Sequence, residues 1–571
     1  MISRRGLLIL TALFSVWLVI YSLRDSRSRY ENWRKEIWAD QAGYYVYLPL
    51  AFNYDFNAQK FPSDIEQKTG HGFHFDQDKV ITKYPIGVAL LLSPFYFTAQ
   101  SLAPLLGYDA DGFSAIYPKA LRIAAVFYFI IGLIFLFRFL SINHKPWVVL
   151  LGLPFIVFGS NLFYYVLEPG MSHVYSFSLF AVLLFAFHKF NTAENDSLKY
   201  RYFLAACALA SLIFNVRQLN IVFIPFLFWI TISNVEALRK NLTYLLHPKR
   251  IMSALGIFLI LYLPQALYNL YAHNTVLLYS YQNESFSQWT HPKIMELWFS
   301  PVCGIFSYNP IQFIILGSLP FLLIKKNKNG IALMLLFLLF SYIYASWHDW
   351  RLGCSYGCRA LVDILPVLCI PLFYLLEKIT TLGGRLALFT SLSVCTLFNM
   401  NICSAYETCF FGKGDWDWAE YKCLINRGNV MQQITGDPFS DFLFRTEEFH
   451  IKNCESQFLH FDGENPKAES TNLSTGEKMK FIYLNETDIG IQLSDGRMFS
   501  IAEDRQEKIV ARKVTLKSWE RFELVPFQGD TIALKAHNGK YLSWHTNSTD
   551  NLMADADKPG ACALFIINRA E

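Results

Sequence analysis

The chain has 571 residues, of which 53% are hydrophobic, 17% are aromatic and only 17% are charged. Soluble domains carry roughly 25% charged residues, and the apolar residues here come in blocks of membrane-spanning length, which argues against a soluble enzyme. The formal charge of +4 without a long basic run argues against nucleic-acid binding, and the 11 cysteines include no CxxC pair with metal-finger spacing.

Long apolar segments fill the chain as far as about Asn401 and predict a polytopic α-helical membrane domain over residues 1–402. We expect about 11 transmembrane helices in this domain. Their predicted ranges are residues 6–23, 120–140, 147–167, 172–189, 203–216, 219–234, 252–272, 309–324, 331–346, 361–377 and 385–402.

The basic residues predict how this domain is oriented, because short cytoplasmic loops are enriched in Lys and Arg. With the N-terminus in the cytoplasm, most basic residues of the short loops fall on the cytoplasmic side. An odd number of spans then places the chain after residue 402 outside the cytoplasm. The short outer loops contain only Arg217, Lys293, Arg351 and Arg359.

Residues 24–119 are predicted to form an unusually long first outer loop. Its stretch from Pro85 is apolar enough to span the membrane, but its prolines disfavour a straight helix, and a span here would invert every later loop. We therefore expect interfacial helices in this loop. The apolar residues 6–23 follow two arginines, as in a signal peptide, but no small-residue cleavage site follows, so a retained anchor is expected.

The long outer loop opens with the sequence WADQAGYYVYLP, in which Asp40 precedes Tyr44 and Tyr45. A carboxylate held just above the bilayer among aromatic rings can accept a proton from an acceptor hydroxyl, because partial desolvation raises its pKa. We interpret Asp40 as a candidate general base and the two tyrosines as candidate substrate-binding residues. The alternative is an ordinary surface or helix-capping aspartate.

Five segments in a fixed order carry a resemblance to a known family. They are WADQAGYYVYLP, TKYPIGVALLLSPF, GSNLFYYVLEPGMSHVYSF, LWFSPVCGIFSYNPI and WHDWRLGCSYGCRALVDILP. Over roughly the first 400 residues the chain resembles the GT-C integral-membrane glycosyltransferases, especially bacterial members related to aminoarabinose and protein mannosyl transferases. The resemblance implies a polyprenyl-phosphate-linked sugar donor, an acceptor on the outer side, a bacterial inner-membrane location and a catalytic aspartate at the position of Asp40.

The resemblance also implies where the donor phosphate binds. Relatives keep an arginine after a Tyr-Gly pair, and Arg359 follows such a pair here; Lys83 stands where relatives carry a basic residue before proline. A guanidinium fork suits phosphate oxygens, and a lysine can pair with them as a point charge. The alternative for each cation is an anchor to lipid headgroups. Weaker candidates of the same kind are Arg351, Arg122 and Arg217.

Four more residues near the outer ends of predicted spans are candidates for binding the sugar or the acceptor. They are Glu168, His173, His348 and Asp349. A carboxylate close to membrane depth is costly without a partner, so structural pairing of Glu168 with a nearby arginine is the alternative.

No cofactor is assigned. Many relatives carry a second acid beside the catalytic aspartate, whereas the neighbours of Asp40 here are Ala39 and Gln41. A divalent metal is therefore compatible with the family but unsupported by these residues. A loop pair such as His71 and His74, without further carboxylates, is more typical of solvent-facing histidines than of metal ligands.

Together with these residues, the resemblance implies a membrane glycosyltransferase that moves a sugar, with inversion, from a polyprenyl-phosphate donor to a glycan, lipid or protein acceptor. The absence of a glycine-rich phosphate loop agrees with a donor that is not a nucleotide. A transporter or flippase of lipid-linked saccharides is the alternative, but the candidate charges gather at outer loops and no repeat relates the two halves. A third hypothesis is a membrane scaffold that displays the C-terminal domain.

Residues 403–440 are predicted to be a linker and residues 441–571 an all-β extracytoplasmic domain. Two stretches repeat at a spacing of 43 residues, and with a looser earlier unit they predict a β-trefoil. The pattern resembles fascin-like trefoils and, more distantly, ricin-type and protein-mannosyltransferase-associated ones. Glycan binding and a structural or docking role both stay open. The matched pairs are Ile489 and Ile532, Gly496 and Gly539, Ser500 and Ser543, Ile509 and Leu552, and Phe522 and Phe565, with Phe481 in the earlier unit.

Cysteines on the outer side lie in a compartment where disulfides form. The first expected pairing is Cys409 with Cys423, and many other connectivities stay open. The other outer candidates are Cys303, Cys354, Cys358, Cys403, Cys454 and Cys562.

Overall fold

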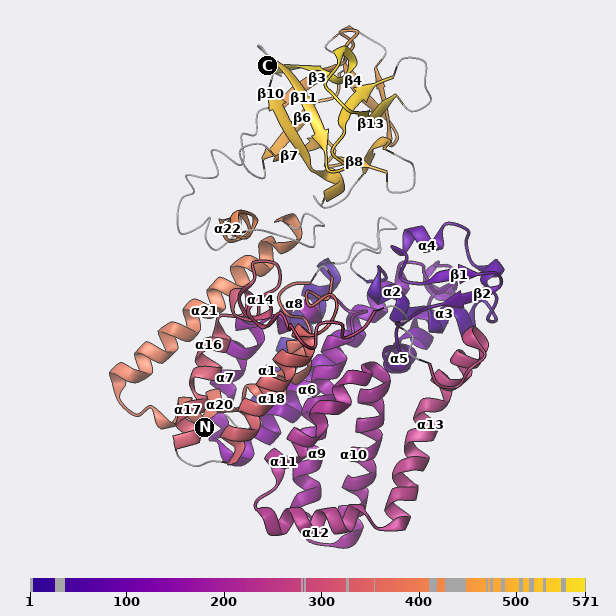
Figure 1. Ribbon diagram of the computed structural model, residues 1–571. Coiled ribbons are helices and arrows are strands. Elements are labelled where there is room, and N and C mark those ends of the chain that lie inside the picture. Colours follow the sequence, from indigo (N-terminus) through magenta and orange to yellow (C-terminus); the bar gives the residue numbers. More distant parts are fainter. Residues whose placement is uncertain are drawn as a thin grey trace. The chain divides into compact units, whose positions relative to one another are not determined.

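The chain divides into two compact units, Met1–Thr396 and Leu397–Glu571. The first unit is mostly helical, and the second contains most of the β-strands (Figure 1). The computed structural model describes residues 4–25, 36–278, 281, 284–324, 328–353, 355–409, 418–426, 448–468, 471–472, 476–483, 488–502, 507–512, 518–526, 530–545 and 551–569.

Helices follow one another through the first unit with short connections. A small antiparallel hairpin, β1 (His74–Asp76) with β2 (Lys79–Ile81), interrupts them. The helices are α1 (Arg4–Asp25), α2 (Asp40–Tyr45), α3 (Tyr47–Phe52), η2 (Ala58–Lys60), α4 (Ile65–Lys68), α5 (Gly87–Leu102), η3 (Pro104–Leu106), α6 (Ile116–Asn143), α7 (Pro146–Gly159), α8 (Leu162–Val166), α9 (His173–Asn191), α10 (Asp196–Val216), η4 (Gln218–Phe223), α11 (Ile224–Thr231), α12 (Val235–Leu245), α13 (Pro248–His273), α14 (Ile294–Phe299), α15 (Ile305–Tyr308), α16 (Ile311–Gly317), α17 (Leu319–Ile324), α18 (Lys328–Ala345), α19 (Leu361–Leu368), α20 (Ile370–Lys378) and α21 (Leu382–Cys409).

Each predicted span overlaps an apolar helix or pair of helices. Within the described residues, five helices are long and apolar enough to cross a membrane by themselves: α6, α9, α10, α13 and α21 as far as Tyr406. Several of the other predicted spans are split between two helices, among them the span divided between α16 and α17 and the span divided between α19 and α20. Pro320 and Pro371 stand in the first turn after these two breaks, where a missing N–H costs little. The count of about 11 spans stays a prediction.

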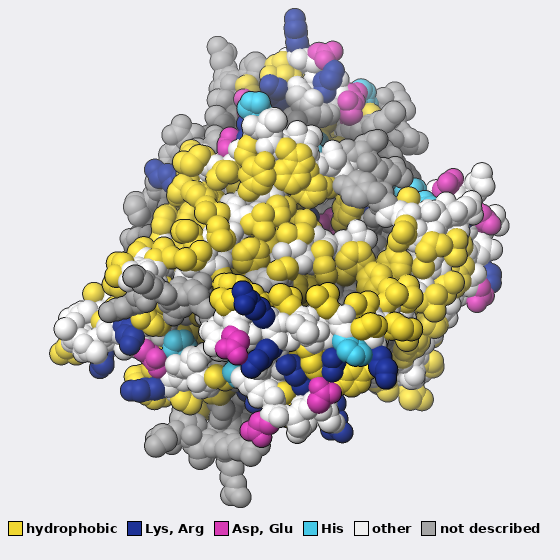
Figure 2. Space-filling model, turned by 60° about the horizontal axis from the view of Figure 1, so that its bottom comes forward, with side chains coloured by type: hydrophobic (Ala, Val, Ile, Leu, Met, Phe, Trp, Pro, Cys, Tyr) yellow, Lys and Arg dark blue, Asp and Glu magenta, His cyan; other side chains and the backbone are white. Residues whose placement is uncertain are grey.

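The long helices α6, α9, α10 and α13 stand side by side in Figure 1. One end of this bundle carries α12, and the opposite end carries α2, α3, α4 and the β1–β2 hairpin. Basic side chains gather on the face around α12, next to a band of apolar side chains (Figure 2). Exposed basic residues at this end include Lys145 before α7, Arg201 in α10, Arg239 and Lys240 in α12, and Lys249 in α13. The orientation with α12 toward the cytoplasm stays a prediction.

Helix α5 belongs to the predicted long outer loop and is seen nearly along its axis in Figure 1, so it lies across the direction of the long helices. Its far end exposes apolar side chains, and in the following η3 turn Leu105 and Leu106 are 79% and 60% exposed. Exposed leucines on a helix that crosses the bundle ends suit a position in the membrane interface.

The described residues of the second unit form α22 (Trp418–Asn426) and 12 strands. Six of these strands close a barrel through antiparallel pairs in the order β3–β6–β7–β10–β11–β14 and back to β3. The pairs β4–β5, β8–β9 and β12–β13 form hairpins. The strands are β3 (Glu448–Lys452), β4 (Leu459–Asp462), β5 (Asn465–Ala468), β6 (Met479–Tyr483), β7 (Asp488–Leu493), β8 (Met498–Ile501), β9 (Ile509–Arg512), β10 (Phe522–Pro526), β11 (Thr531–Ala536), β12 (Tyr541–Trp544), β13 (Leu552–Ala556) and β14 (Phe565–Arg569).

The residues matched in the sequence repeat occupy equivalent strands. Ile489 and Ile532 lie in β7 and β11, and Phe522 and Phe565 lie in β10 and β14, all of them buried in one apolar core. Gly496 has φ of 85° and Gly539 has φ of 80°, so both turns use the left-handed conformation that glycine adopts without strain. The predicted repeat therefore corresponds to a four-strand unit that recurs along the chain.

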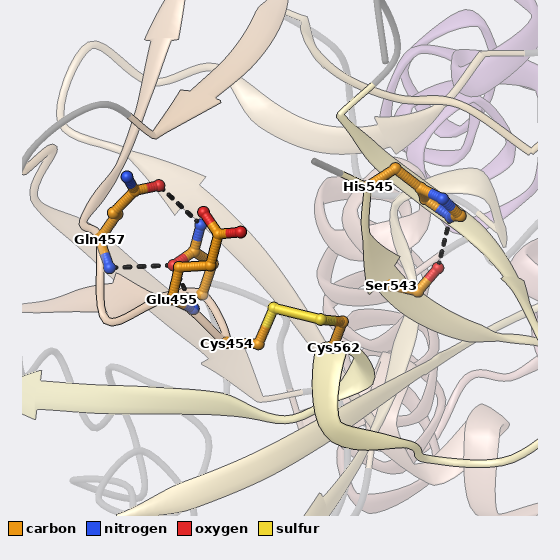
Figure 3. Close-up of a disulfide and its surroundings, with 7 residues drawn as sticks. Cys454, Glu455, Gln457, Ser543, His545 and Cys562 are labelled. Atoms are coloured by element: carbon orange, nitrogen blue, oxygen red, sulfur yellow. Dashed lines mark hydrogen bonds between the residues drawn. A yellow bond between two sulfur atoms is a disulfide. The ribbon is translucent and has the colours of Figure 1, made fainter. Parts of the chain in front are cut away.

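The disulfide in the described residues is Cys454–Cys562, which joins the loop after β3 to the η7 turn (Ala561–Ala563) before β14 (Figure 3). The pairing that we expected first, Cys409 with Cys423, falls on side chains outside those described. Helix α21 continues to Cys409 and α22 follows, so part of the predicted linker 403–440 is helical.

Replacing Cys454 with Ser is expected to destabilise the second unit by about 2–5 kcal/mol, because the bond closes a loop of 108 residues. The full-length protein is heated in steps, and the protease sensitivity of its C-terminal part at each temperature measures the change. Cys207→Ser, in α10, is the control and should leave that part unchanged. Equal protease resistance of the Cys454 variant and the wild type would contradict the prediction.

Candidate functional site

Asp40 is the first residue of α2, and the backbone before it has an unusual conformation. Ala39 has φ of 48°, in the left-handed region that few residues other than glycine adopt. Its N–H donates to the Thr69 carbonyl at 2.8 Å. Its own carbonyl lies against Gly72, where an added Cβ would come within 1.9 Å of that oxygen. Contacts with residues 69–72 therefore hold the turn that determines where the Asp40 carboxylate stands.

A buried ion pair anchors the segment that leads to Asp40. Nε of Arg122, on α6, lies 2.5 Å from Oε1 of Glu36, and both side chains are fully buried. The same guanidinium donates to the Ser22 carbonyl on α1 at 2.8 Å. A guanidinium without exposed surface cannot reach a lipid phosphate, so the sequence-based assignment of Arg122 to the donor is corrected to a structural one.

Arg359 lies just before α19, in a loop held by buried contacts. The Tyr356 ring is fully buried and stacks on the Tyr164 ring, with centroids 4.6 Å apart. The side-chain amide of Asn161 donates to the Cys358 carbonyl at 2.9 Å. These contacts fix the backbone on the N-terminal side of Arg359 and leave its guanidinium partly exposed.

The two residues expected to act together, Asp40 and Arg359, form an ion pair. Nη1 of Arg359 lies 2.8 Å from Oδ2 of Asp40, and the two side chains are 18% and 27% exposed. The Tyr84 hydroxyl donates to the other carboxylate oxygen of Asp40. The Tyr44 ring lies against the Tyr84 ring, with centroids 4.7 Å apart. A carboxylate, a guanidinium and two tyrosines thus share one partly open site.

These neighbours overturn the expected rise in the pKa of Asp40. Burial alone would raise the pKa, but the Arg359 guanidinium, the Tyr84 hydrogen bond and the Lys83 ammonium together hold it below its ordinary value. The sequence predicts that Asp40 and Arg359 act in one site, but it does not reveal that the guanidinium contacts the carboxylate directly. In this state Asp40 is an ionised and weakly basic carboxylate.

Lys83 approaches the same site from the segment before α5. Its ammonium pairs with the Glu284 carboxylate, and both side chains are about one-third exposed. The ammonium also lies 5.7 Å from the centre of the Tyr84 ring and 5.6 Å from that of Tyr281. Lys83 therefore stands next to the residue that binds Asp40, and Glu284 is a partner that the sequence did not reveal; the role of Lys83 toward a donor phosphate stays a prediction.

Sequence reasoning missed a second cluster, around Asp363 in α19. Oδ1 of Asp363 lies 2.9 Å from Nδ1 of His173, and Oδ2 accepts from Asn220 at 3.0 Å. Nη1 of Arg217 lies 3.4 Å from the same Oδ2. A carboxylate inside an apolar predicted span is costly unless it has partners, so the acid in the run ALVDILPVL was the signal available in the sequence.

Further candidates lie among polar or buried partners. His173 pairs with Asp363, while Glu168 accepts a hydrogen bond from the Gln41 side chain at 2.6 Å. The Tyr45 side chain is fully buried and its hydroxyl donates to a backbone carbonyl, which indicates packing and not substrate contact.

In the loop before α19, Asp349 pairs with Arg351, whose Nε lies 2.8 Å from Oδ1 of the carboxylate. Burial would raise the pKa of Asp349, but bonds from Arg351 and from the Gly353 N–H lower it below its ordinary value. His348 is exposed. These three candidates form a neighbouring loop, and their roles stay predictions.

No group of three or more His, Cys, Asp and Glu side chains that could hold a metal ion occurs in the part of the chain that the structure describes. His71 and His74 are both exposed. The donor set of the site, two carboxylates paired with cations and surrounded by tyrosines, does not fit a divalent metal, which needs free oxygen ligands.

Among solved structures, the chain is similar to two crystal structures of ArnT from Cupriavidus metallidurans. The one bound to undecaprenyl phosphate is 10% identical, with a TM-score of 0.48, over 75% of this chain and 70% of that chain. The apo state is 8% identical, with a TM-score of 0.43, over 74% and 67%. No protein-family model matches the sequence. No curated protein matches it either.

Proposed function

We propose that the protein is a GT-C membrane glycosyltransferase that transfers a sugar from a polyprenyl-phosphate donor to an acceptor outside the cytoplasm. The observation that carries this proposal is the ion pair between Asp40 and Arg359, 2.8 Å apart and partly exposed. Transfer from a phosphate needs a base for the acceptor and a cation for the leaving group, and these two residues supply both. The motif order in the sequence supports the same reaction.

The change in charge during transfer explains why cations line the site. The bond between the anomeric carbon and a phosphate oxygen breaks, and the phosphate leaves with its electron pair, so its charge grows from one negative charge to two. The acceptor oxygen bonds to the anomeric carbon from the opposite face, and its proton passes to Asp40. Arg359 and Lys83 then stabilise charge that appears only as the bond breaks, which speeds the reaction itself.

Donor binding would also activate the base. In the empty site the Arg359 guanidinium is bound to Asp40, so a donor phosphate has to compete with that carboxylate. Once the phosphate takes the guanidinium, Asp40 loses the main interaction that lowers its pKa, and burial raises the pKa again. The carboxylate thereby becomes a stronger base only when a donor is present.

A difference between two pH profiles follows from this exchange. Transfer requires ionised Asp40, so activity falls as the pH drops through its pKa. The acid limb of kcat/KM for the donor reports the empty enzyme and should lie below the ordinary aspartate value of about 3.9. The acid limb of kcat reports the donor complex and should lie at higher pH. Initial rates from about pH 2.5 to pH 8 cover both limbs, and coinciding limbs would contradict the exchange.

The proposed reaction can be tested with purified full-length protein in detergent and a panel of labelled polyprenyl-phosphate sugars. Release of polyprenyl phosphate together with a glycosylated or hydrolysed product is the expected result. Movement of an intact lipid-linked saccharide across vesicles, without cleavage, would instead support a flippase. If the protein neither cleaved nor bound any of these donors, the proposal would be overturned.

We also propose that the second unit is a β-trefoil outside the cytoplasm. Three successive units of four strands, each giving two strands to a closed barrel and two to a hairpin, support the trefoil. The Cys454–Cys562 disulfide supports an oxidising compartment, because such bonds are rare in the cytosol. The basic residues around α12 support a cytoplasmic location for the other end of the helical unit.

A further inference from the structure

Arg217 lies at the junction between α10 and η4, and one side of its guanidinium is held by buried groups. Its Nη1 lies 3.4 Å from Oδ2 of Asp363 and 3.1 Å from Nδ1 of His173. The Asp363 and His173 side chains are each 1% exposed, whereas that of Arg217 is 17% exposed. The guanidinium therefore has a buried side, which faces its partners, and a side that is still accessible.

Asp363 is positioned to hold this guanidinium firmly. Besides Arg217, it receives the Asn220 amide at 3.0 Å and the His173 ring at 2.9 Å, so its two oxygens engage three side chains. A buried charge is tolerated only when its partners satisfy it, and a carboxylate bound from three directions has little freedom to move. Such a carboxylate acts as a rigid support for the arginine that it binds.

Arg217 lies close enough to Tyr44 to act on that side chain electrostatically. Burial raises the pKa of the Tyr44 hydroxyl, and Arg217 and Arg359 both act against that rise, so the two guanidinium groups influence the same hydroxyl. The Tyr44 ring lies 4.7 Å from the ring of Tyr84, whose hydroxyl binds Asp40. Arg217 thus approaches, across Tyr44, the site that Arg359 forms with Asp40.

We propose that Asp363 is a positioning residue that holds Arg217 as a second guanidinium for the donor phosphate, opposite Arg359. The inference rests on the proposed function and deepens it: the phosphate of the polyprenyl donor is held between two arginines, one of which Asp363 positions. Because Asp363 lies in the first turn of α19, four residues after Arg359 in the loop before that helix, one segment of the chain positions both guanidinium groups. Two forked donors match the oxygens of a phosphate better than one.

The test compares binding of polyprenyl phosphate with binding of the uncharged polyprenol to full-length protein in detergent. Asp363→Asn is expected to raise the Kd of the phosphate by about tenfold, equivalent to about 1.4 kcal/mol, and to leave the Kd of the polyprenol unchanged. A merely structural role would change both ligands together or neither. Glu377→Gln removes a comparable carboxylate, bonded to His144 at 3.1 Å at the end of α20, and should leave both constants unchanged.

A double-mutant cycle separates positioning from general damage. Arg217→Gln should weaken phosphate binding at least as much as Asp363→Asn, and the double variant should bind no more weakly than Arg217→Gln alone. If Asp363→Asn does not fold because Arg217 loses its counter-charge, the double variant removes both charges and is measured in its place. Additive losses, or wild-type phosphate binding by a folded Asp363→Asn or Arg217→Gln protein, would overturn the inference.

The binding assay requires no sugar transfer, so the outcomes for the two proposals are distinct. Phosphate-selective binding that depends on Asp363, in a protein that cleaves no donor, would reject the transferase and keep this inference. Donor cleavage that depends on Asp40 but not on Asp363 or Arg217 would keep the transferase and reject this inference.

Discussion

Asp40→Asn is expected to lower the rate of sugar transfer by about 10²- to 10⁴-fold, because an amide cannot accept the proton of the acceptor hydroxyl. The variant keeps the size of the side chain, and its amide oxygen can still accept the Tyr84 hydrogen bond. Folding, and binding of polyprenyl phosphate, should therefore be kept. Single-turnover rates with a labelled donor, together with a binding isotherm for polyprenyl phosphate, measure the two effects separately.

A matched control for this variant lies in the same outer loop. Asp55 pairs with Lys60 at 2.6 Å, with both side chains exposed by half or more, so Asp55→Asn removes an ion pair without touching the site. It should transfer at the wild-type rate. If Asp40→Asn were as active as Asp55→Asn, the assignment of the general base would be wrong.

The Asp40 variant also separates the three functional hypotheses. Loss of transfer with retained lipid binding supports an enzyme. Retained movement of a lipid-linked saccharide across vesicles would support a flippase, since moving an intact saccharide needs no proton acceptor at this position. Absence of donor binding in both the wild type and the variant would leave only a scaffold that displays the second unit.

Arg359→Gln is expected to lower the transfer rate by about 10²- to 10³-fold and to weaken binding of polyprenyl phosphate, because a neutral amide cannot stabilise the charge that grows on the leaving phosphate. Arg359→Lys should give an intermediate loss, since it keeps the charge but not the forked geometry. The change in donor Kd and the change in kcat are compared across the three proteins. A loss in kcat that exceeds the loss in binding measures the part of the interaction that forms only in the transition state.

Arg250 offers a matched control, because it is also an arginine paired with an aspartate. It pairs with Asp196 at 3.3 Å and is 19% exposed, close to the 18% of Arg359, but it lies at the α12 end of the bundle. Arg250→Gln should leave both donor binding and transfer unchanged. Equal losses in the two arginine variants would point to general destabilisation and contradict a specific role for Arg359.

Much of the fold could be predicted because it depends on patterns along the chain. Blocks of apolar residues marked the helices, and the repeat in the C-terminal part placed Ile489, Ile532, Phe522 and Phe565 on equivalent strands. Breaks within helices were harder to predict, since Pro320 and Pro371 end one helix and allow another to begin at once. The disulfide partner of Cys454 could not be predicted, because many pairings of the outer cysteines were equally compatible with the sequence.

The site was predicted only in part, because its energetics depend on pairs that are distant in the chain. Motif positions gave Asp40 and Arg359 without their distance, so the lowering of the Asp40 pKa could not be foreseen. Arg122 was a weaker candidate of the same kind as Arg359, and only its complete burial against Glu36 reveals a structural role. Asp363 was overlooked because it sits within a hydrophobic run that reads as an ordinary span.

The ion pair between Asp40 and Arg359 has a consequence for turnover. In the proposed reaction the spent carrier has one more negative charge than the fresh donor, so the cations hold the product more tightly than the substrate. After accepting a proton and losing it to solvent, Asp40 is again an anion beside Arg359 and competes with the product for that guanidinium. The carboxylate that starts the reaction thus also helps to expel the used lipid and prepares the enzyme for another cycle.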